Sequence, residues 1–167
     1  MPQDADSIQL YLVRHADAGD PQAWAGNDDD RPLSDKGRRQ SERLGRFLKA
    51  IDFQTEAVVS SPKSRALDTA RIVAHRLGAE VKVDERLGAS VSLRRLEEIM
   101  SDLGARRPML VGHDPDFSAL VAMLCGASRV PMKKGALCRI DVQPPLQPGG
   151  GVLRWLIPPG LLREGED

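Results

Sequence analysis

An arginine and a histidine, Arg14 and His15, directly follow the first hydrophobic run of the chain, residues 10–13. The same layout recurs twice, because Arg65 comes shortly after a second hydrophobic run and His113 follows a third after one glycine. Each run is typical of a buried strand. Since the carboxyl ends of the strands in one α/β sheet face the same crevice, we expect these four side chains to converge.

Two guanidinium groups and two imidazoles supply what phosphoryl transfer requires. A guanidinium presents a planar set of N–H groups that matches phosphate oxygens, and a neutral imidazole nitrogen can attack phosphorus in line. In the transition state the transferred group spreads its charge over three equatorial oxygens, which fixed positive donors stabilise. The residues therefore predict phosphoryl transfer without a metal or other cofactor, with phosphate or another oxyanion in the pocket.

Hydrophobic periodicity predicts the strands and helices that position these residues. The expected strands are residues 8–13, 57–60, 81–83 and 108–111. The expected helices are one that Ser34 caps and that ends near residue 51, and residues 62–77, 92–103 and 115–124. Residues 136–142 and 152–157 predict an antiparallel hairpin around a Pro/Gly loop. We expect a three-layer α/β/α fold with a mostly parallel central sheet and this hairpin at the carboxyl end.

The length of 167 residues suits a single domain, with an ordered core at about residues 8–160 and a solvated tail at residues 163–167. The 24 basic and 24 acidic residues cancel, which disfavours nucleic acid and membranes as partners. Cys125 and Cys138 lack metal-ligand spacing, and no apolar stretch approaches the length of a membrane span. We expect a cytoplasmic protein with reduced thiols.

Four segments of the chain resemble motifs of the histidine phosphatase superfamily. They are Leu12-Val13-Arg14-His15-Ala16, Arg31-Pro32-Leu33-Ser34-Asp35-Lys36-Gly37, Ser61-Pro62-Lys63-Ser64-Arg65-Ala66-Leu67-Asp68-Thr69-Ala70 and Val111-Gly112-His113-Asp114-Pro115. The resemblance implies a phosphoglycerate mutase-like fold and a phosphohistidine intermediate on His15. It also implies that Arg14, Arg65 and His113 bind the phosphoryl group.

Within the superfamily the chain is similar to the small SixA-type phosphohistidine phosphatases. The short chain, Lys133-Lys134-Gly135-Ala136-Leu137 and Trp155-Leu156-Ile157-Pro158-Pro159 carry this likeness. The short connection between the third strand and its helix leaves little chain for a lid, so we expect a shallow pocket. Such a pocket suits a phosphorylated protein in signal transduction, such as a histidine phosphotransfer domain.

Larger family members carry a carboxylic acid near the end of the third strand, where this chain offers only Asp84 and Glu85. An alkoxide leaving group needs a proton from such an acid, whereas imidazole leaves phosphorus more readily. A poor match at this position therefore favours a phosphohistidine substrate. Asp17 is the other candidate, either as the acid or as a hydrogen-bonding partner of His15.

Several alternatives remain open on the sequence. The chain could be a phosphomonoesterase that acts on a small metabolite, or a non-catalytic module that binds a phosphorylated partner. Lys133 and Lys134 either extend a positive rim toward an acidic partner or are simply exposed. The acidic run at residues 28–30 is typical of a solvated face, and we assign it no metal.

Overall fold

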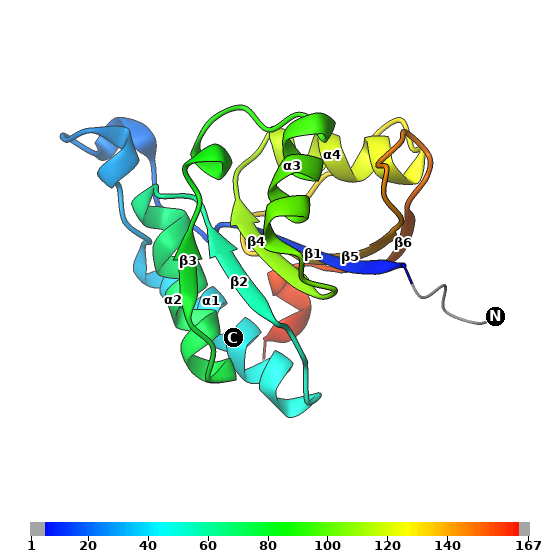
Figure 1. Ribbon diagram of the computed structural model, residues 1–167. Coiled ribbons are helices and arrows are strands. Elements are labelled where there is room, and N and C mark those ends of the chain that lie inside the picture. The colour runs from blue at the N-terminus through cyan, green and yellow to red at the C-terminus, as the bar shows by residue number, and fades with distance from the viewer. Residues whose placement is uncertain (1–5, 164–167) are drawn as a thin grey trace.

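The computed structural model describes residues 6–163 and shows a six-stranded sheet in the order β3-β2-β4-β1-β5-β6 (Figure 1). The bounds are β1 (Ile8–Arg14), β2 (Ala57–Ser60), β3 (Val81–Val83), β4 (Pro108–Gly112), β5 (Leu137–Val142) and β6 (Val152–Ile157). The tail expected at residues 163–167 lies outside the described residues beyond Arg163.

The first four strands of the order form the parallel part of the sheet. β2 pairs in parallel with β3 and with β4, and β4 pairs in parallel with β1. β5 runs antiparallel to β1 and forms the expected hairpin with β6. The hairpin thus extends the sheet from β1, which confirms the mostly parallel sheet with an antiparallel carboxyl end.

Helices cover both faces of the sheet, with α1 (Asp35–Ala50) and α2 (Ser64–Leu77) on one side and α3 (Leu93–Leu103) and α4 (Asp116–Cys125) on the other (Figure 1). Alternate residues of β1 enter the two cores, because Leu10 and Leu12 belong to one cluster and Tyr11 and Val13 to the other. This burial on both faces explains the continuous hydrophobic run. None of the helices in the described part of the chain is long and apolar enough to cross a membrane.

Local capping chemistry sets where the helices begin. Ser34 caps α1, since its Oγ accepts a hydrogen bond from the backbone N–H of Gly37 at 3.1 Å. α2 begins at Ser64, two residues later than expected, because Lys63 is still extended and serves as its N-cap. Likewise, Pro115 is the N-cap of α4 and not its first residue.

A close contact fastens the loop after β1 onto the first turn of α1. A Cβ at Gly37 would overlap the carbonyl oxygen of Asp17, so only glycine lets the loop approach this closely. The backbone N–H of Ser34 donates to the same carbonyl at 3.0 Å. The loop contains two short 3₁₀ helices, η1 (Pro21–Ala23) and η2 (Asp28–Asp30), the second of which reaches the candidate site.

Candidate active site

The structure brings the four expected side chains together at the carboxyl edge of the parallel strands. Backbone hydrogen bonds align the strand ends, from the N–H of His15 to the carbonyl of Gly112 and from the N–H of Ser61 to the carbonyl of Val111, each at 3.0 Å. The imidazole rings of His15 and His113 lie with their centroids 5.2 Å apart. The two histidines therefore share one site.

The His15 imidazole is buried and oriented by the backbone. Its Nδ1 lies 2.7 Å from the carbonyl oxygen of Ala16. Because a carbonyl can only accept, Nδ1 carries the ring proton and Nε2 keeps its lone pair. Burial, followed by the charges of Arg65 and Arg14, lowers the pKa of His15 to about 4. The ring is therefore a neutral nucleophile at physiological pH.

The His113 imidazole is also neutral at physiological pH. Burial, together with the neighbouring His15 and Arg65, lowers the pKa of His113 to about 3. Its Nε2 lies 2.7 Å from the hydroxyl of Ser61, a residue at the end of β2. The other nitrogen, Nδ1, is buried without a hydrogen-bond partner among the described residues. When the Ser61 hydroxyl donates to Nε2, Nδ1 bears a proton that it can offer to an anion.

The two guanidinium groups are each held by a backbone carbonyl. Arg14 donates from Nη1 to Met132 at 2.7 Å and lies 3.4 Å from a carboxylate oxygen of Asp114. Arg65 donates from Nη1 to the carbonyl of Asp28 at 2.8 Å, and burial lowers its pKa. The Nε atoms of both arginines are buried and, in residues 6–163, without a partner.

Unpaired buried donors of this kind are costly. Leaving one unsatisfied costs about 1–3 kcal/mol, and more when the donor is charged. Three such atoms occur in this site, Arg14 Nε, Arg65 Nε and His113 Nδ1. An anion that accepted from them would recover this cost, so the site has the chemistry of an oxyanion receptor.

A threonine that the sequence reasoning did not single out connects the nucleophile segment to α2. Thr69 Oγ1 accepts from the N–H of Ala16 at 3.1 Å and donates to the carbonyl of Arg65 at 2.7 Å. Since Thr69 is fully buried, these bonds fix the end of β1 relative to the first turn of α2. Thr69 and Ser61 both lie in the segment that resembles the family motif, which was the available signal for them.

The acidic run at residues 28–30 is exposed, as expected, but Asp28 has a contact that the sequence did not reveal. Its carboxylate lies 3.3 Å from Nη2 of Arg65 and 2.9 Å from Nε of Arg31. The hydrogen bond from Arg31, more than any other cause, lowers the pKa of Asp28. An anionic substrate must therefore share Arg65 with an ionised carboxylate.

The candidate acids differ in their surroundings. Asp17 accepts from the Ser34 hydroxyl at 2.6 Å and from the N–H of Gly19 at 3.2 Å, and the Ser34 bond is the main cause that lowers its pKa. Asp84 is held by the guanidinium of Arg86 at 2.7 Å, which lowers its pKa as well. Both are carboxylates at neutral pH and thus poor proton donors.

The remaining candidate acid, Glu85, is an exposed residue at the start of η3 (Glu85–Gly88). The Nδ1 of His15 is occupied by the Ala16 carbonyl, so this backbone oxygen already fixes the ring. The roles of Asp17 and Glu85 as acid or supporting residue stay predictions.

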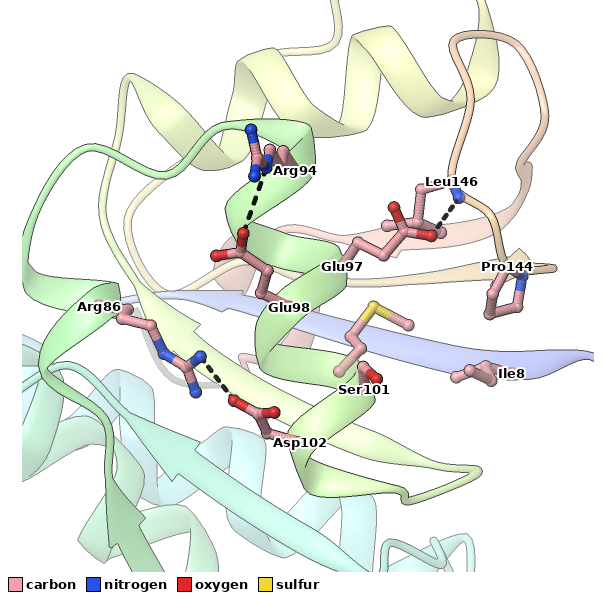
Figure 2. A pocket seen from close by; sticks show the side chains of 10 residues that line it. Ile8, Arg86, Arg94, Glu97, Glu98, Ser101, Asp102, Pro144 and Leu146 are labelled. Atoms are coloured by element: carbon pink, nitrogen blue, oxygen red, sulfur yellow. Dashed lines mark hydrogen bonds and ion pairs between the residues drawn. The ribbon is translucent and has the colours of Figure 1, made fainter.

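A separate cavity lies away from these residues. It has a volume of about 630 Å³ and lies beside α3, where Ile8 and Leu146 form part of its wall (Figure 2). Its charged side chains are paired with their neighbours, as in the Arg86–Asp102 contact at 2.7 Å and the bond from the N–H of Leu146 to Glu97 at 2.9 Å. We assign the chemistry to the strand ends, where buried donors have no hydrogen-bond partner among the residues that the structure describes.

The chain is similar in sequence to a protein family and to several known proteins. The family model described as "Histidine phosphatase superfamily (branch 1)" matches residues 10–89. Phosphohistidine phosphatase SixA of Escherichia coli (strain K12) is 27% identical over 162 residues, which cover 93% of this chain and 97% of that protein. The probable phosphoglycerate mutase GpmB of Cronobacter sakazakii is 29% identical over 114 residues, or 65% of this chain and 52% of that protein.

A solved structure extends the similarity to the whole fold. The structure of the protein histidine phosphatase SixA complexed with tungstate superimposes with a TM-score of 0.79 at 26% sequence identity. The match covers 93% of this chain and 100% of that chain. The sheet and its covering helices are therefore those of a SixA-like, phosphoglycerate mutase-like α/β fold.

Proposed function

This chain belongs to the histidine phosphatase superfamily, and from that premise we propose that it removes phosphate from phosphohistidine on a protein partner. In this proposal His15 is the nucleophile, and Arg14, Arg65 and His113 bind the phosphoryl group. The observation that carries the proposal is the set of three buried donors around a neutral imidazole that find no partner within the described chain, residues 6–163.

The reaction proceeds in two steps. In the first, the lone pair of His15 Nε2 attacks phosphorus, the P–N bond of the substrate breaks, and its electron pair stays on the leaving imidazole. A leaving imidazole that is protonated on its other nitrogen departs as a neutral molecule, so no acid from the enzyme is needed. In the second, water attacks the phosphorus on His15, which releases inorganic phosphate and a proton and restores the imidazole.

The protein groups contribute mainly through charge and orientation. The Ala16 carbonyl holds the His15 ring with Nε2 available for attack. The same carbonyl oxygen accepts from Nδ1–H and can stabilise the positive charge that develops on the ring. Arg14 and Arg65 stay in place because backbone carbonyls bind one nitrogen of each. Donors fixed in advance cost no reorganisation as the charge spreads over the transferred group.

Two features support a phosphohistidine substrate. The candidate carboxylates Asp17 and Asp84 are held in the ionised form, and a phosphoramidate needs an acid less than an ester does. The similarity to SixA of Escherichia coli spans almost the full length of both proteins.

Tungstate in the related structure is a tetrahedral oxyanion like phosphate, the kind of ligand that the unpaired donors fit.

The alternative is a phosphomonoesterase for a small metabolite, which the similarity to a probable phosphoglycerate mutase favours. A panel that compares a phosphorylated histidine phosphotransfer domain with sugar phosphates separates the two functions. We expect kcat/KM to be highest for the phosphoprotein. A clear preference for a sugar phosphate would contradict the proposal, and binding of phosphate without turnover would favour a recognition module.

A further inference from the structure

A second polar cavity, with a volume of about 420 Å³, lies between the first turns of α1 and the short helix η4 (Pro159–Leu162). We call it the cationic groove. Among its lining residues are Lys36, Arg39, Gln40, Arg43, Pro159 and Arg163. All four charged residues in this set are cations, although the whole chain has as many acidic as basic residues.

Three cations of α1 that line the groove, Lys36, Arg39 and Arg43, have no carboxylate partner within residues 6–163. The one acidic residue in the middle of α1, Glu42, instead binds Arg76 of α2 at 2.7 Å. Like charges three and four residues apart share a helix face and weaken the helix, so stability alone does not favour this arrangement.

The groove is adjacent to the candidate active site. Gln40, part of its wall, accepts a hydrogen bond from the N–H of Asp17 at 3.0 Å. At its other side a Cβ on Gly135 would lie 3.5 Å from Gln40 and from Pro159. The N–H of Gly135 donates at 3.0 Å to the carbonyl of His15. One layer of residues thus separates the groove from the nucleophile segment.

Lys134 is a cation close to both the loop after β1 and the candidate active site. Lys134 Nζ lies 3.9 Å from Asp17, and its charge also acts on the buried His15. Lys36, at the start of α1, acts on the same Asp17 carboxylate. Lys134 and Lys36 thus both act on the ionised Asp17 carboxylate, which lies between the candidate active site and the first turns of α1.

We propose that the cationic groove docks an acidic segment of the phosphorylated protein partner while its phosphohistidine reaches His15. This inference rests on the proposed function, because it assumes that the phosphoryl group arrives on a protein. Charge complementarity identifies the occupant, since carboxylates of the partner would neutralise the unpaired cations. A small substrate that fills only the phosphate site would not reach the groove.

The test uses two synthetic phosphohistidine peptides that differ only in a flanking run of glutamates or glutamines. We expect a lower KM for the acidic peptide, and we expect Arg39→Glu to raise that KM about fivefold or more at low salt. The Arg39→Glu variant should hydrolyse the neutral peptide and phosphoramidate at the wild-type rate. The matched control is Arg71→Glu, which makes the same change in charge. Arg71 is an exposed residue of α2 that does not line the groove.

Equal KM values for the two peptides, or equal effects of the Arg39 and Arg71 substitutions, would overturn the docking proposal. A separate binding measurement keeps it distinct from the proposed function. If no phosphohistidine is hydrolysed, the proposed function fails, and the affinity for the unphosphorylated acidic peptide still reports on docking through its sensitivity to Arg39→Glu. Binding of tripolyphosphate in the groove with no preference for the acidic peptide would also refute a protein partner.

Discussion

Replacing Arg65 with alanine removes the more buried of the two guanidinium groups, whose side chain is 9% exposed against 22% for Arg14. One nitrogen of Arg65 donates to the Asp28 carbonyl, while Nε has no partner in residues 6–163 and is free to bind a phosphoryl oxygen. Loss of one such transition-state donor costs about 100-fold or more in kcat, or about 2.7 kcal/mol of the barrier.

The same substitution should leave the fold nearly unchanged. It removes the hydrogen bond to the Asp28 carbonyl but also removes a buried, desolvated cation with an unpaired N–H, and these effects oppose each other. The assay is the steady-state hydrolysis of phosphoramidate, with urea unfolding to measure stability. Arg71→Ala, at an exposed position on the same helix, is the control and should retain full activity.

Near-normal kcat in a folded Arg65→Ala protein would refute this reasoning, because it would place the guanidinium outside the transition-state contacts. Arg65→Lys refines the test. Lysine keeps the charge but not the planar set of donors, so we expect activity between those of the wild type and the alanine variant. Full activity of the lysine variant would show that charge alone matters.

Three further predictions follow from the site and its supports. Because folding lowers the pKa of His15 to about 4 and of His113 to about 3, the unfolded state binds more protons below about pH 6.5. The free energy of unfolding should therefore fall as pH drops from 6.5 toward 4, by roughly 1 kcal/mol per pH unit for each imidazole. Urea denaturation at a series of pH values measures this, and His113→Gln should reduce the dependence of the unfolding free energy on pH. An unchanged dependence in the variant would contradict the lowered pKa of His113. Gly37→Ala should destabilise the protein by about 1–3 kcal/mol in thermal unfolding, since its Cβ would overlap a carbonyl oxygen of the loop after β1, and a wild-type Tm would refute that contact. Asp28→Asn should tighten inhibition by tungstate a few-fold, because it removes a negative charge beside Arg65, whereas weaker inhibition would mean that Asp28 supports anion binding.

The sequence predicted the sheet, its covering helices and the convergence of the four main residues. It did so because hydrophobic periodicity depends on local positions along the chain, and because strand ends in an α/β sheet share one edge. The contact of Asp28 with Arg65 was not predictable in this way. It joins residues 37 positions apart through the path of a loop, for which periodicity carries no information.

The supporting hydroxyl groups were missed for a related reason. Ser61 and Thr69 gain their importance from partners on other elements, His113 and Ala16, whose positions depend on tertiary packing. The later start of α2 is a local difference, because the extended conformation of Lys63 delays the helix by two residues. The single-domain organisation, the substrate class and the cytoplasmic location stay predictions.

The central claim is a covalent phosphoryl intermediate on His15, and rapid quenching of the protein with a radiolabelled phosphohistidine substrate tests it most directly. We predict an acid-labile, base-stable label that mass spectrometry assigns to His15 and that is absent from His15→Ala. Turnover without any label, or a label that persists in the His15→Ala variant, would contradict the account.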